Sequence, residues 1–156
     1  MPCPAILFVC LGNICRSPLA EAAFRQAAEA AGLVVKVDSA GTGDWHVGKA
    51  PDRRAQATAL AAGIDISGYR ARQLEPDDFG WFTHIFVMDH ENLADARAIA
   101  PAGARAQPVL LLDLVPGREG EAVADPYYGG QDQFAATWAD VSAAAHALVT
   151  RLQSHG

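Results

Sequence analysis

Residues 10 to 17 read Cys10-Leu11-Gly12-Asn13-Ile14-Cys15-Arg16-Ser17 and lie between an apolar run and a helical segment. The run, residues 5–9 (Ala-Ile-Leu-Phe-Val), is typical of a buried parallel strand. Gly12 and Asn13 tolerate the positive φ angles that a tight loop needs. Ser17 is a candidate helix cap, Pro18 suits a first helical turn, and small apolar residues follow at helical spacing over residues 19–31. The sequence therefore predicts a strand, a tight loop and a helix.

Such a loop is suited to binding phosphate. Its backbone N–H groups and the positive end of the helix dipole attract an anion, and Arg16 offers a planar fork for two phosphate oxygens. The same positive field favours the reactive thiolate form of Cys10. We therefore predict Cys10 as nucleophile and Arg16 as phosphate clamp. The alternative is a buried thiol at the end of a strand, because free cysteine is among the most buried residue types.

Composition places limits on the class of protein. A chain of 156 residues with 51% hydrophobic residues is expected to form one domain, residues 1–156, with a substantial core. No stretch is long enough to span a membrane and no signal peptide is evident, so we expect a cytoplasmic protein that binds no membrane. The three cysteines all lie within the first fifteen residues, which is a poor disulfide framework and suits a reducing compartment.

The net charge of −6 argues against nucleic-acid binding, so an anionic substrate must be attracted by a local positive site. Other basic residues either add to that site or form a solvated surface, which is the simpler interpretation: Lys49, Arg53, Arg54, Arg70 and Arg72. The five histidines (46, 84, 90, 146 and 155) lack the paired spacing of metal ligands, so we expect neither a metal nor another cofactor.

Along the chain, short apolar runs alternate with helical segments. Further strands are predicted at residues 33–39, 84–88 and 108–112, and further helices at residues 53–62, 92–99 and 134–152. This alternation indicates an α/β fold with a parallel sheet covered on both faces. Ligands bind beyond the carboxyl ends of such strands, where Cys10, Ser39 and Asp89 are expected. Asp89 is either a supporting carboxylate or only a helix cap.

A second candidate segment lies in the loop predicted at residues 117–130. It contains Asp125, followed by Pro126 and the pair Tyr127 and Tyr128. A carboxyl group can protonate a leaving group and then activate water. The alternative is an ordinary Asp-Pro turn anchored by the tyrosines, but beside the Cys10 loop a catalytic acid is the better interpretation. Asp38, Asp44 and Asp89 are the other candidates for the acid. Together with Trp45, the two tyrosines suggest an aromatic cleft for an aryl group; Trp81 and Trp138 are assigned to packing.

The residues resemble the low-molecular-weight protein tyrosine phosphatase family. Six pieces occur in the family's order and extend over nearly the whole chain: residues 9–18, 38–41 (Asp-Ser-Ala-Gly), 44–48 (Asp-Trp-His-Val-Gly), 71–74 (Ala-Arg-Gln-Leu), 88–89 with Asn92, and 125–128. The resemblance implies a three-layer, four-stranded parallel sheet of flavodoxin-like or Rossmann-like type. It also implies hydrolysis of phosphotyrosine in proteins, and of small aryl phosphates, through a phosphocysteine.

The resemblance further assigns roles to individual residues. Cys10, Arg16 and Asp125 would be nucleophile, phosphate binder and general acid then base. Ser17 would stabilise the thiolate, and Asn13 would adopt a strained left-handed conformation with Ser39 as a partner. Cys15 would trap oxidised Cys10 as a reversible disulfide. The expected partners are a phosphotyrosine protein such as a tyrosine kinase, with inorganic phosphate and other oxyanions as inhibitors.

One departure and two alternatives accompany this resemblance. Bacterial relatives often carry histidine where this chain has Tyr69, so Tyr69 either substitutes for it or the loop is tuned differently. Phosphoarginine phosphatases of the family typically have threonine in place of Ile14 and lack the paired tyrosines. Redox arsenate reductases use further cysteines downstream, and none follows Cys15 here. An aryl phosphate is therefore the favoured substrate. A phosphate-binding module without catalysis is the remaining alternative, but it would need no acid, and Asp125 argues against it.

Overall fold

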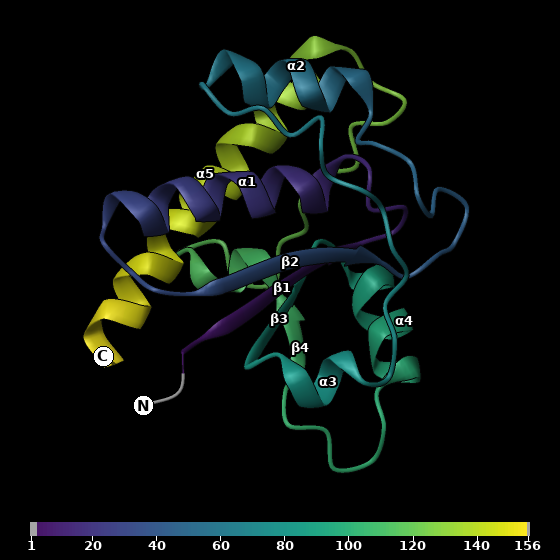
Figure 1. Ribbon diagram of the computed structural model, residues 1–156, viewed down its shortest axis with the longest axis vertical. Helices are drawn as coiled ribbons and strands as arrows, with labels where there is room; N and C mark the ends of the chain where they lie inside the picture. Colours follow the sequence, from purple (N-terminus) through teal and green to yellow (C-terminus); the bar gives the residue numbers. More distant parts are fainter. Residues whose placement is uncertain (1–2, 156) are drawn as a thin grey trace.

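The computed structural model describes residues 3–155 and contains a four-stranded parallel sheet in the order β2-β1-β3-β4. The strands are β1 (Ala5–Cys10), β2 (Lys36–Gly41), β3 (His84–Val87) and β4 (Pro108–Leu110). The helices are α1 (Arg16–Ala30), α2 (Arg53–Ala61), α3 (Asp78–Trp81), α4 (His90–Ile99) and α5 (Gln131–His155), with a 3-10 helix η1 (Leu111–Leu114). In Figure 1, α1, α2 and α5 lie on one side of the sheet and α3 and α4 on the other. The predicted three-layer α/β architecture is confirmed.

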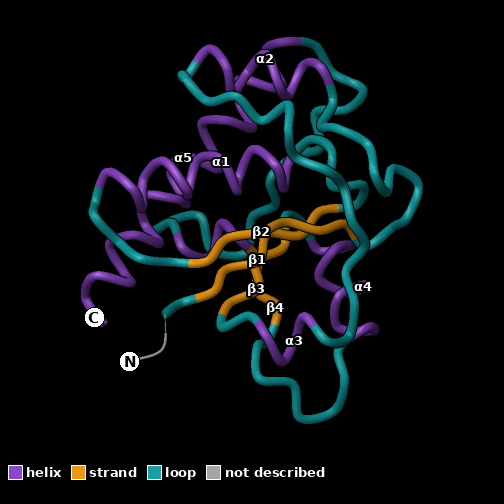
Figure 2. The backbone as a smooth tube through the Cα atoms, viewed as in Figure 1, coloured by secondary structure: helices purple, strands orange, loops and turns teal. Residues whose placement is uncertain are grey.

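β1 is buried along its whole length because helices cover both of its faces. Its side chains alternate between two apolar clusters, as the period of a strand requires. Phe8 faces α1 and α5 and contacts Phe24 and Phe86, with ring centroids 5.9 and 6.1 Å apart. Leu7 and Val9 face α3 and α4. Figure 2 shows the strands at the centre of the molecule, so the carboxyl end of β1 is held on both sides.

Several predicted element ends differ from the structure. The second strand pairs from Lys36 to Gly41 rather than over residues 33–39, because β1 begins at Ala5, which lies opposite Lys36. The fourth strand ends at Leu110, and the chain continues as η1. Helix α1 begins at Arg16 after Cys15, without a side-chain cap, so the expectation that Ser17 caps this helix is wrong.

The assignment of Trp81 to packing is also wrong, since this side chain is 54% exposed. It sits on α3, a four-residue turn at the surface, and meets Phe82 edge-on with centroids 4.6 Å apart. Trp138 does pack against the α1 and α5 side of the core.

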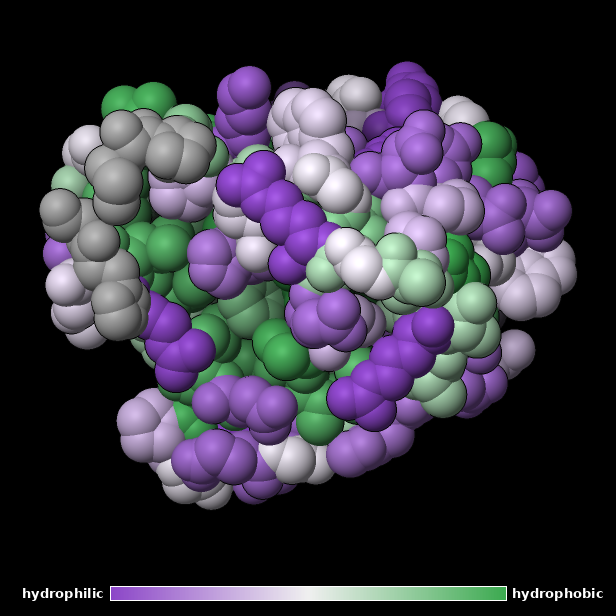
Figure 3. All heavy atoms as spheres, turned by 90° about the horizontal axis from the view of Figure 1, so that it is seen from below, coloured by the Kyte–Doolittle hydropathy of each residue, from purple (hydrophilic) through white to green (hydrophobic). Residues whose placement is uncertain are grey.

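Figure 3 shows the molecule from below relative to Figure 1, and on this face apolar side chains lie in a hollow between charged ones. Among residues 3–155, no helix combines the length and hydropathy that crossing a bilayer requires.

Candidate active site

A cavity of about 210 Å³ opens at the carboxyl end of β1, where open parallel sheets bind ligands. It is lined by Cys10, Leu11, Gly12, Ile14, Cys15, Arg16, Trp45, His46, Asp125, Tyr127 and Tyr128. The structure thus brings together the two segments that sequence analysis singled out, residues 10–17 and 125–128. His46 was missed. Its position next to Trp45 in a turn-rich loop is the signal that could have found it.

The loop between β1 and α1 turns its carbonyl groups away from the cavity. The carbonyl oxygens of Cys10, Leu11 and Ile14 accept hydrogen bonds of 2.8–2.9 Å from the amides of Thr42, Gly43 and Asp52. This leaves donors on the other side of the loop. Within residues 3–155, the amides of Gly12, Ile14 and Cys15 donate to no protein acceptor. Together with the first turn of α1 they are the donors from which the sequence predicted an anion cradle.

Gly41, at the end of β2, lets the loop come close to the sheet. A Cβ atom at this position would lie 2.6 Å from the carbonyl oxygen of Leu11 and 3.1 Å from the amide nitrogen of Asn13. Both contacts are with backbone atoms, which cannot move away independently. A larger residue at position 41 would therefore displace the loop and the cradle.

The thiol of Cys10 is buried and carries hydrogen-bond partners of its own. Its Sγ lies 3.0 Å from the hydroxyl of Ser17 and accepts from the amide of Asn13 at 3.3 Å. Ser17 lies in the first turn of α1, one residue inside the helix, which directs its hydroxyl back toward the loop rather than to a cap position. These two contacts fix the position of the sulfur at the end of β1.

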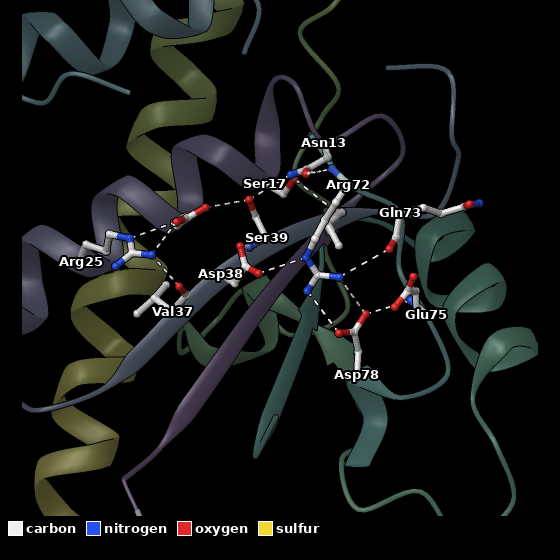
Figure 4. Close-up of polar contacts among 12 residues, drawn as sticks. Asn13, Ser17, Arg25, Val37, Asp38, Ser39, Arg72, Gln73, Glu75 and Asp78 are labelled. Atoms are coloured by element: carbon white, nitrogen blue, oxygen red, sulfur yellow. Dashed lines mark hydrogen bonds and ion pairs between the residues drawn. The ribbon is translucent and has the colours of Figure 1, made fainter. Parts of the chain in front are cut away.

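A chain of side chains behind the loop orients the Ser17 hydroxyl (Figure 4). The carboxylate of Glu21 accepts a 2.7 Å bond from the hydroxyl of Ser39. The oxygen of Ser39 in turn accepts a 3.0 Å bond from the side-chain amide (Nδ2) of Asn13. Asn13 also donates to Ser17 at 2.8 Å. The Ser17 oxygen thus accepts from Asn13, and its hydroxyl hydrogen is free to donate either to the Cys10 sulfur at 3.0 Å or to the carbonyl of Ala40 at 3.5 Å, of which the sulfur is the shorter contact. Glu21, which sequence analysis missed, fixes the direction of this chain because a carboxylate only accepts.

Burial raises the pKa of Glu21, while hydrogen bonds from Ser39 and Arg25 oppose the shift. Arg25 donates to Glu21 through Nε at 3.0 Å and Nη2 at 2.8 Å. This fork favours the ionised carboxylate that the chain of hydrogen bonds needs.

Asn13 is held in the left-handed conformation, with φ of 58°, as the resemblance implied. Its side-chain oxygen accepts a 3.0 Å bond from the amide of Arg72. The Arg72 guanidinium is anchored by Asp38 at 3.0 Å and Asp78 at 3.1 Å (Figure 4). The strained backbone is therefore maintained from outside the loop. The interpretation of Arg72 as a solvated side chain is wrong.

The guanidinium of Arg16 is buried and only half satisfied by the protein. Its Nη1 atom donates to Asp89 at 2.7 Å and to the carbonyl of Val123 at 2.9 Å. Within residues 3–155, neither Nε nor Nη2 donates a hydrogen bond, which leaves a two-donor edge at the cavity. Burial alone would lower the pKa of Arg16, but the charges of Cys10, Asp89 and Asp125 outweigh it and raise the pKa.

Asp89 serves both of the roles that the sequence left open. One carboxylate oxygen binds Arg16, and the other accepts from the amide of Asn92 at 2.7 Å and so caps α4. This second bond fixes the orientation of the carboxylate, and thus of the Arg16 edge. Val123, whose carbonyl holds the same guanidinium, carried no signal in the sequence because a backbone acceptor is common to all residues.

Asp125 lies at the mouth of the cavity, with its side chain 44% exposed. Its Oδ2 atom is 3.7 Å from Nη2 of Arg16, and its Oδ1 accepts from the amide of Tyr127 at 3.1 Å. Tyr127 and Tyr128 stand edge-to-face with centroids 5.0 Å apart, and Tyr128 is 96% exposed. Trp45 is 65% exposed. The three rings thus form an open aromatic rim rather than a closed slot.

Four of the predicted site residues lie behind the cavity rather than in its lining: Asn13, Ser17, Ser39 and Asp89. Tyr69 lines a small hollow on that side together with Asn13 and Ser39. Among the described residues it makes no hydrogen bond to the loop; Glu21 and Arg72 provide the polar support there instead. No group of three or more His, Cys, Asp or Glu side chains within residues 3–155 is arranged to hold a metal ion.

Comparison with known proteins agrees with this geometry. The model of the low molecular weight phosphotyrosine protein phosphatase family matches residues 5–156. The phosphatase of that name from Schizosaccharomyces pombe is 46% identical over 132 residues, which is 83% of this chain and 84% of the relative. YfkJ, a low molecular weight protein-tyrosine-phosphatase of Bacillus subtilis, is 44% identical over 128 residues, or 81% and 82% of the two chains.

Solved structures agree as well. The crystal structure of YfkJ superposes with a TM-score of 0.90 and covers 99% of this chain and 98% of its own. DARP, a drosophila arginine phosphatase, also superposes with a TM-score of 0.90, at 30% identity and with 97% and 99% coverage. The resemblance found in the motifs is confirmed: the chain belongs to the low molecular weight phosphotyrosine protein phosphatase family.

Proposed function

We propose that Cys10, Arg16 and Asp125 of this protein-tyrosine phosphatase hydrolyse phosphotyrosine in proteins, within a single domain formed by residues 1–156. The observation that carries the proposal is the position of the Cys10 sulfur. It lies within hydrogen-bond distance of the Ser17 hydroxyl and the Asn13 backbone amide. The loop amides and the edge of Arg16 that have no protein acceptor among residues 3–155 belong to residues lining the same cavity. An anion bound to those donors is presented directly to a nucleophile.

The reaction proceeds in two displacements. The thiolate of Cys10 attacks phosphorus, and as the bond to the tyrosine oxygen breaks, Asp125 transfers its proton to that oxygen. Asp125, now a carboxylate, takes a proton from water, whose oxygen attacks the phosphocysteine. The sulfur–phosphorus bond breaks, phosphate leaves, and the thiolate is restored. Arg16 and the loop amides stabilise the charge on the phosphoryl oxygens in both steps.

The rim of the cavity supports an aryl substrate. Trp45, Tyr127 and Tyr128 offer ring faces and edges to a phenyl group. Ile14 adds an apolar side chain to the same cavity. We propose a phosphotyrosine protein, such as a tyrosine kinase, as substrate, inorganic phosphate and other oxyanions as inhibitors, and the cytoplasm as the place of action. Nucleic acids and membranes are not expected partners.

An arginine phosphatase is the second candidate, because the drosophila enzyme of that activity shares the fold over nearly the whole chain. The decisive experiment compares two peptides of one sequence, one carrying phosphotyrosine and the other phosphoarginine. We expect kcat/KM to favour phosphotyrosine by about tenfold or more, the scale of discrimination that pocket contacts provide. A preference for phosphoarginine would contradict the proposal that the aromatic rim selects an aryl group. Turnover of neither peptide would favour a phosphate-binding module.

Oxidation gives an independent prediction for Cys15. Peroxide converts the Cys10 thiolate to a sulfenic acid, and attack by the Cys15 sulfur releases water and forms a disulfide. Burial, followed by the charges of Asp52 and Cys10, raises the pKa of Cys15, and oxidation of Cys10 removes one of those charges. Without the Cys15 sulfur, a second peroxide oxidises the sulfenic acid of Cys10 to a sulfinic acid, which dithiothreitol does not reduce. We therefore expect dithiothreitol to restore the activity of the wild-type enzyme after treatment with excess peroxide, whereas Cys15→Ser stays inactive. Equal recovery in the two proteins would refute a protective disulfide.

A further inference from the structure

Arg54 connects two parts of the chain that meet at the cavity. It lies in the first turn of α2, where its charge was interpreted as part of a solvated surface. Instead, its Nη2 donates to the carbonyl oxygen of Tyr127 at 2.9 Å and its Nη1 to that of Gly129 at 3.1 Å. Both carbonyls belong to the acid loop, which we define as residues 125–129.

The other side of the Arg54 guanidinium is anchored near the phosphate-binding loop. Asp52 accepts from Nε at 3.0 Å and from Nη2 at 3.1 Å, and it also caps α2. The amide of Asp52 donates to the carbonyl of Ile14 at 2.8 Å. A hydrogen bond from Arg54 lowers the pKa of Asp52, which keeps its carboxylate ionised. Arg54 thus links the acid loop to the loop that holds phosphate.

Aromatic rings hold the plane of the same guanidinium. Its central carbon lies 4.7 Å from the ring centroid of Phe134 and 5.6 Å from that of Tyr127. Phe134 is fully buried at the start of α5 and is therefore a fixed support. A planar cation held by rings and forked hydrogen bonds loses little further entropy when it binds the loop.

The acid loop has few other attachments. Within the described residues, the only hydrogen bonds joining residues 125–129 to another part of the chain come from Arg54. The remaining polar contact is the 3.7 Å ion pair between Asp125 and Arg16, and a substrate phosphate bound to Arg16 would compete for it. With phosphate bound, Arg54 is therefore the polar contact that keeps the loop in place.

We propose that Arg54 is a positioning residue that holds the acid loop over the phosphate-binding loop, so that Asp125 reaches the leaving-group oxygen. This inference rests on the proposed role of Asp125 as general acid. It adds a function for a side chain that touches neither the substrate nor the reacting atoms. Proton transfer requires hydrogen-bond distance, so a small displacement of the loop is costly.

The test is Arg54→Gln, with Arg53→Gln as its matched control, because Arg53 is the exposed neighbour without a hydrogen bond among residues 3–155. Phenyl phosphate, whose leaving group needs a proton, is compared with 2,4-dinitrophenyl phosphate, whose leaving group does not. Arg54→Gln is expected to lower kcat for phenyl phosphate by about 10- to 100-fold, the loss typical of a misplaced catalytic group. On the dinitrophenyl ester the change stays within about threefold, and Arg53→Gln is within twofold of wild type on both esters.

Two further variants separate positioning from charge and from general damage. Arg54→Lys keeps the charge but not the fork, and is expected to resemble Arg54→Gln; wild-type activity in Arg54→Lys would overturn the positioning role. In an Asp125→Asn background, Arg54→Gln should add no further loss on phenyl phosphate. An added loss there, or an equal loss on both esters, would refute the proposal for Arg54. If the loss caused by Asp125→Asn did not depend on the leaving group, the proposed acid role of Asp125 would be refuted, independently of the result for Arg54.

Discussion

Replacing Cys10 with serine is expected to lower kcat by about 10⁵-fold, the scale of loss when a catalytic nucleophile is removed. A serine hydroxyl stays protonated in the place where the Cys10 sulfur accepts from Ser17 and Asn13. The variant therefore does not form a covalent phosphoenzyme in place of the phosphocysteine. The cradle itself depends on backbone amides and Arg16, so Cys10→Ser should still bind inorganic phosphate and vanadate. The measurement is steady-state phosphate release together with calorimetric titration of the oxyanion.

The matched control for this variant is Cys3→Ser, since Cys3 is partly exposed and its thiol contacts the carbonyl of Val34, away from the cavity. It should retain wild-type turnover. Residual activity in Cys10→Ser above about one per cent of wild type would mean that another group attacks phosphorus. Loss of oxyanion binding together with turnover would show instead that the loop had collapsed, and thermal unfolding would reveal it.

Asp125→Asn is expected to slow phenyl phosphate by about 10²- to 10⁴-fold, the usual contribution of general acid catalysis. The Oδ2 atom of Asp125 lies 3.7 Å from Nη2 of Arg16, so this carboxyl group stands next to the guanidinium that would bind the substrate phosphate. An amide has no proton of comparable acidity to give. The loss on 2,4-dinitrophenyl phosphate should be much smaller, because its leaving group is stable as the anion.

Single-turnover and steady-state rates on the two esters measure this difference. Asp132→Asn is the control, since Asp132 is an exposed carboxylate in the first turn of α5. It should match wild type on both esters. Equal losses on the two esters in Asp125→Asn would sink the acid role and return Asp125 to the simple turn that the sequence also allowed. A loss confined to hydrolysis of the phosphocysteine would leave Asp125 with the base role alone.

Much of the candidate site is visible in the sequence because it is contiguous. The loop residues follow one another, so glycine, asparagine and a helix start at fixed offsets suffice to predict an anion cradle. The acid loop was harder to predict, since Asp-Pro is common in turns. Its occurrence in the same chain as the Cys10 loop, and then its place in the order of the family motifs, favoured a catalytic carboxyl.

The errors occur where a side chain has two local options. Ser17 was expected to cap α1, but the thiol of Cys10 and the amide of Asn13 compete for its hydroxyl, and they lie on the loop side. Trp81 was expected to pack, but α3 is too short to bury a large ring. Arg54 and Arg72 were interpreted as solvated, because some of their acceptors lie far along the chain: Tyr127 for Arg54 and Asp38 for Arg72.

The sequence by itself determined the local pieces: the strand of residues 5–9, the loop that follows, and the helical segments, since such preferences act between residues a few positions apart. The tertiary structure decided which side chains support them. Arg16 meets Asp89, 73 residues away, because β1 and β3 lie side by side with their carboxyl ends together. It meets Val123, 107 residues away, because the amide of Val123 donates to the carbonyl of Met88 at the end of β3. Contacts at that separation follow from the order of strands in the sheet, which no local preference encodes.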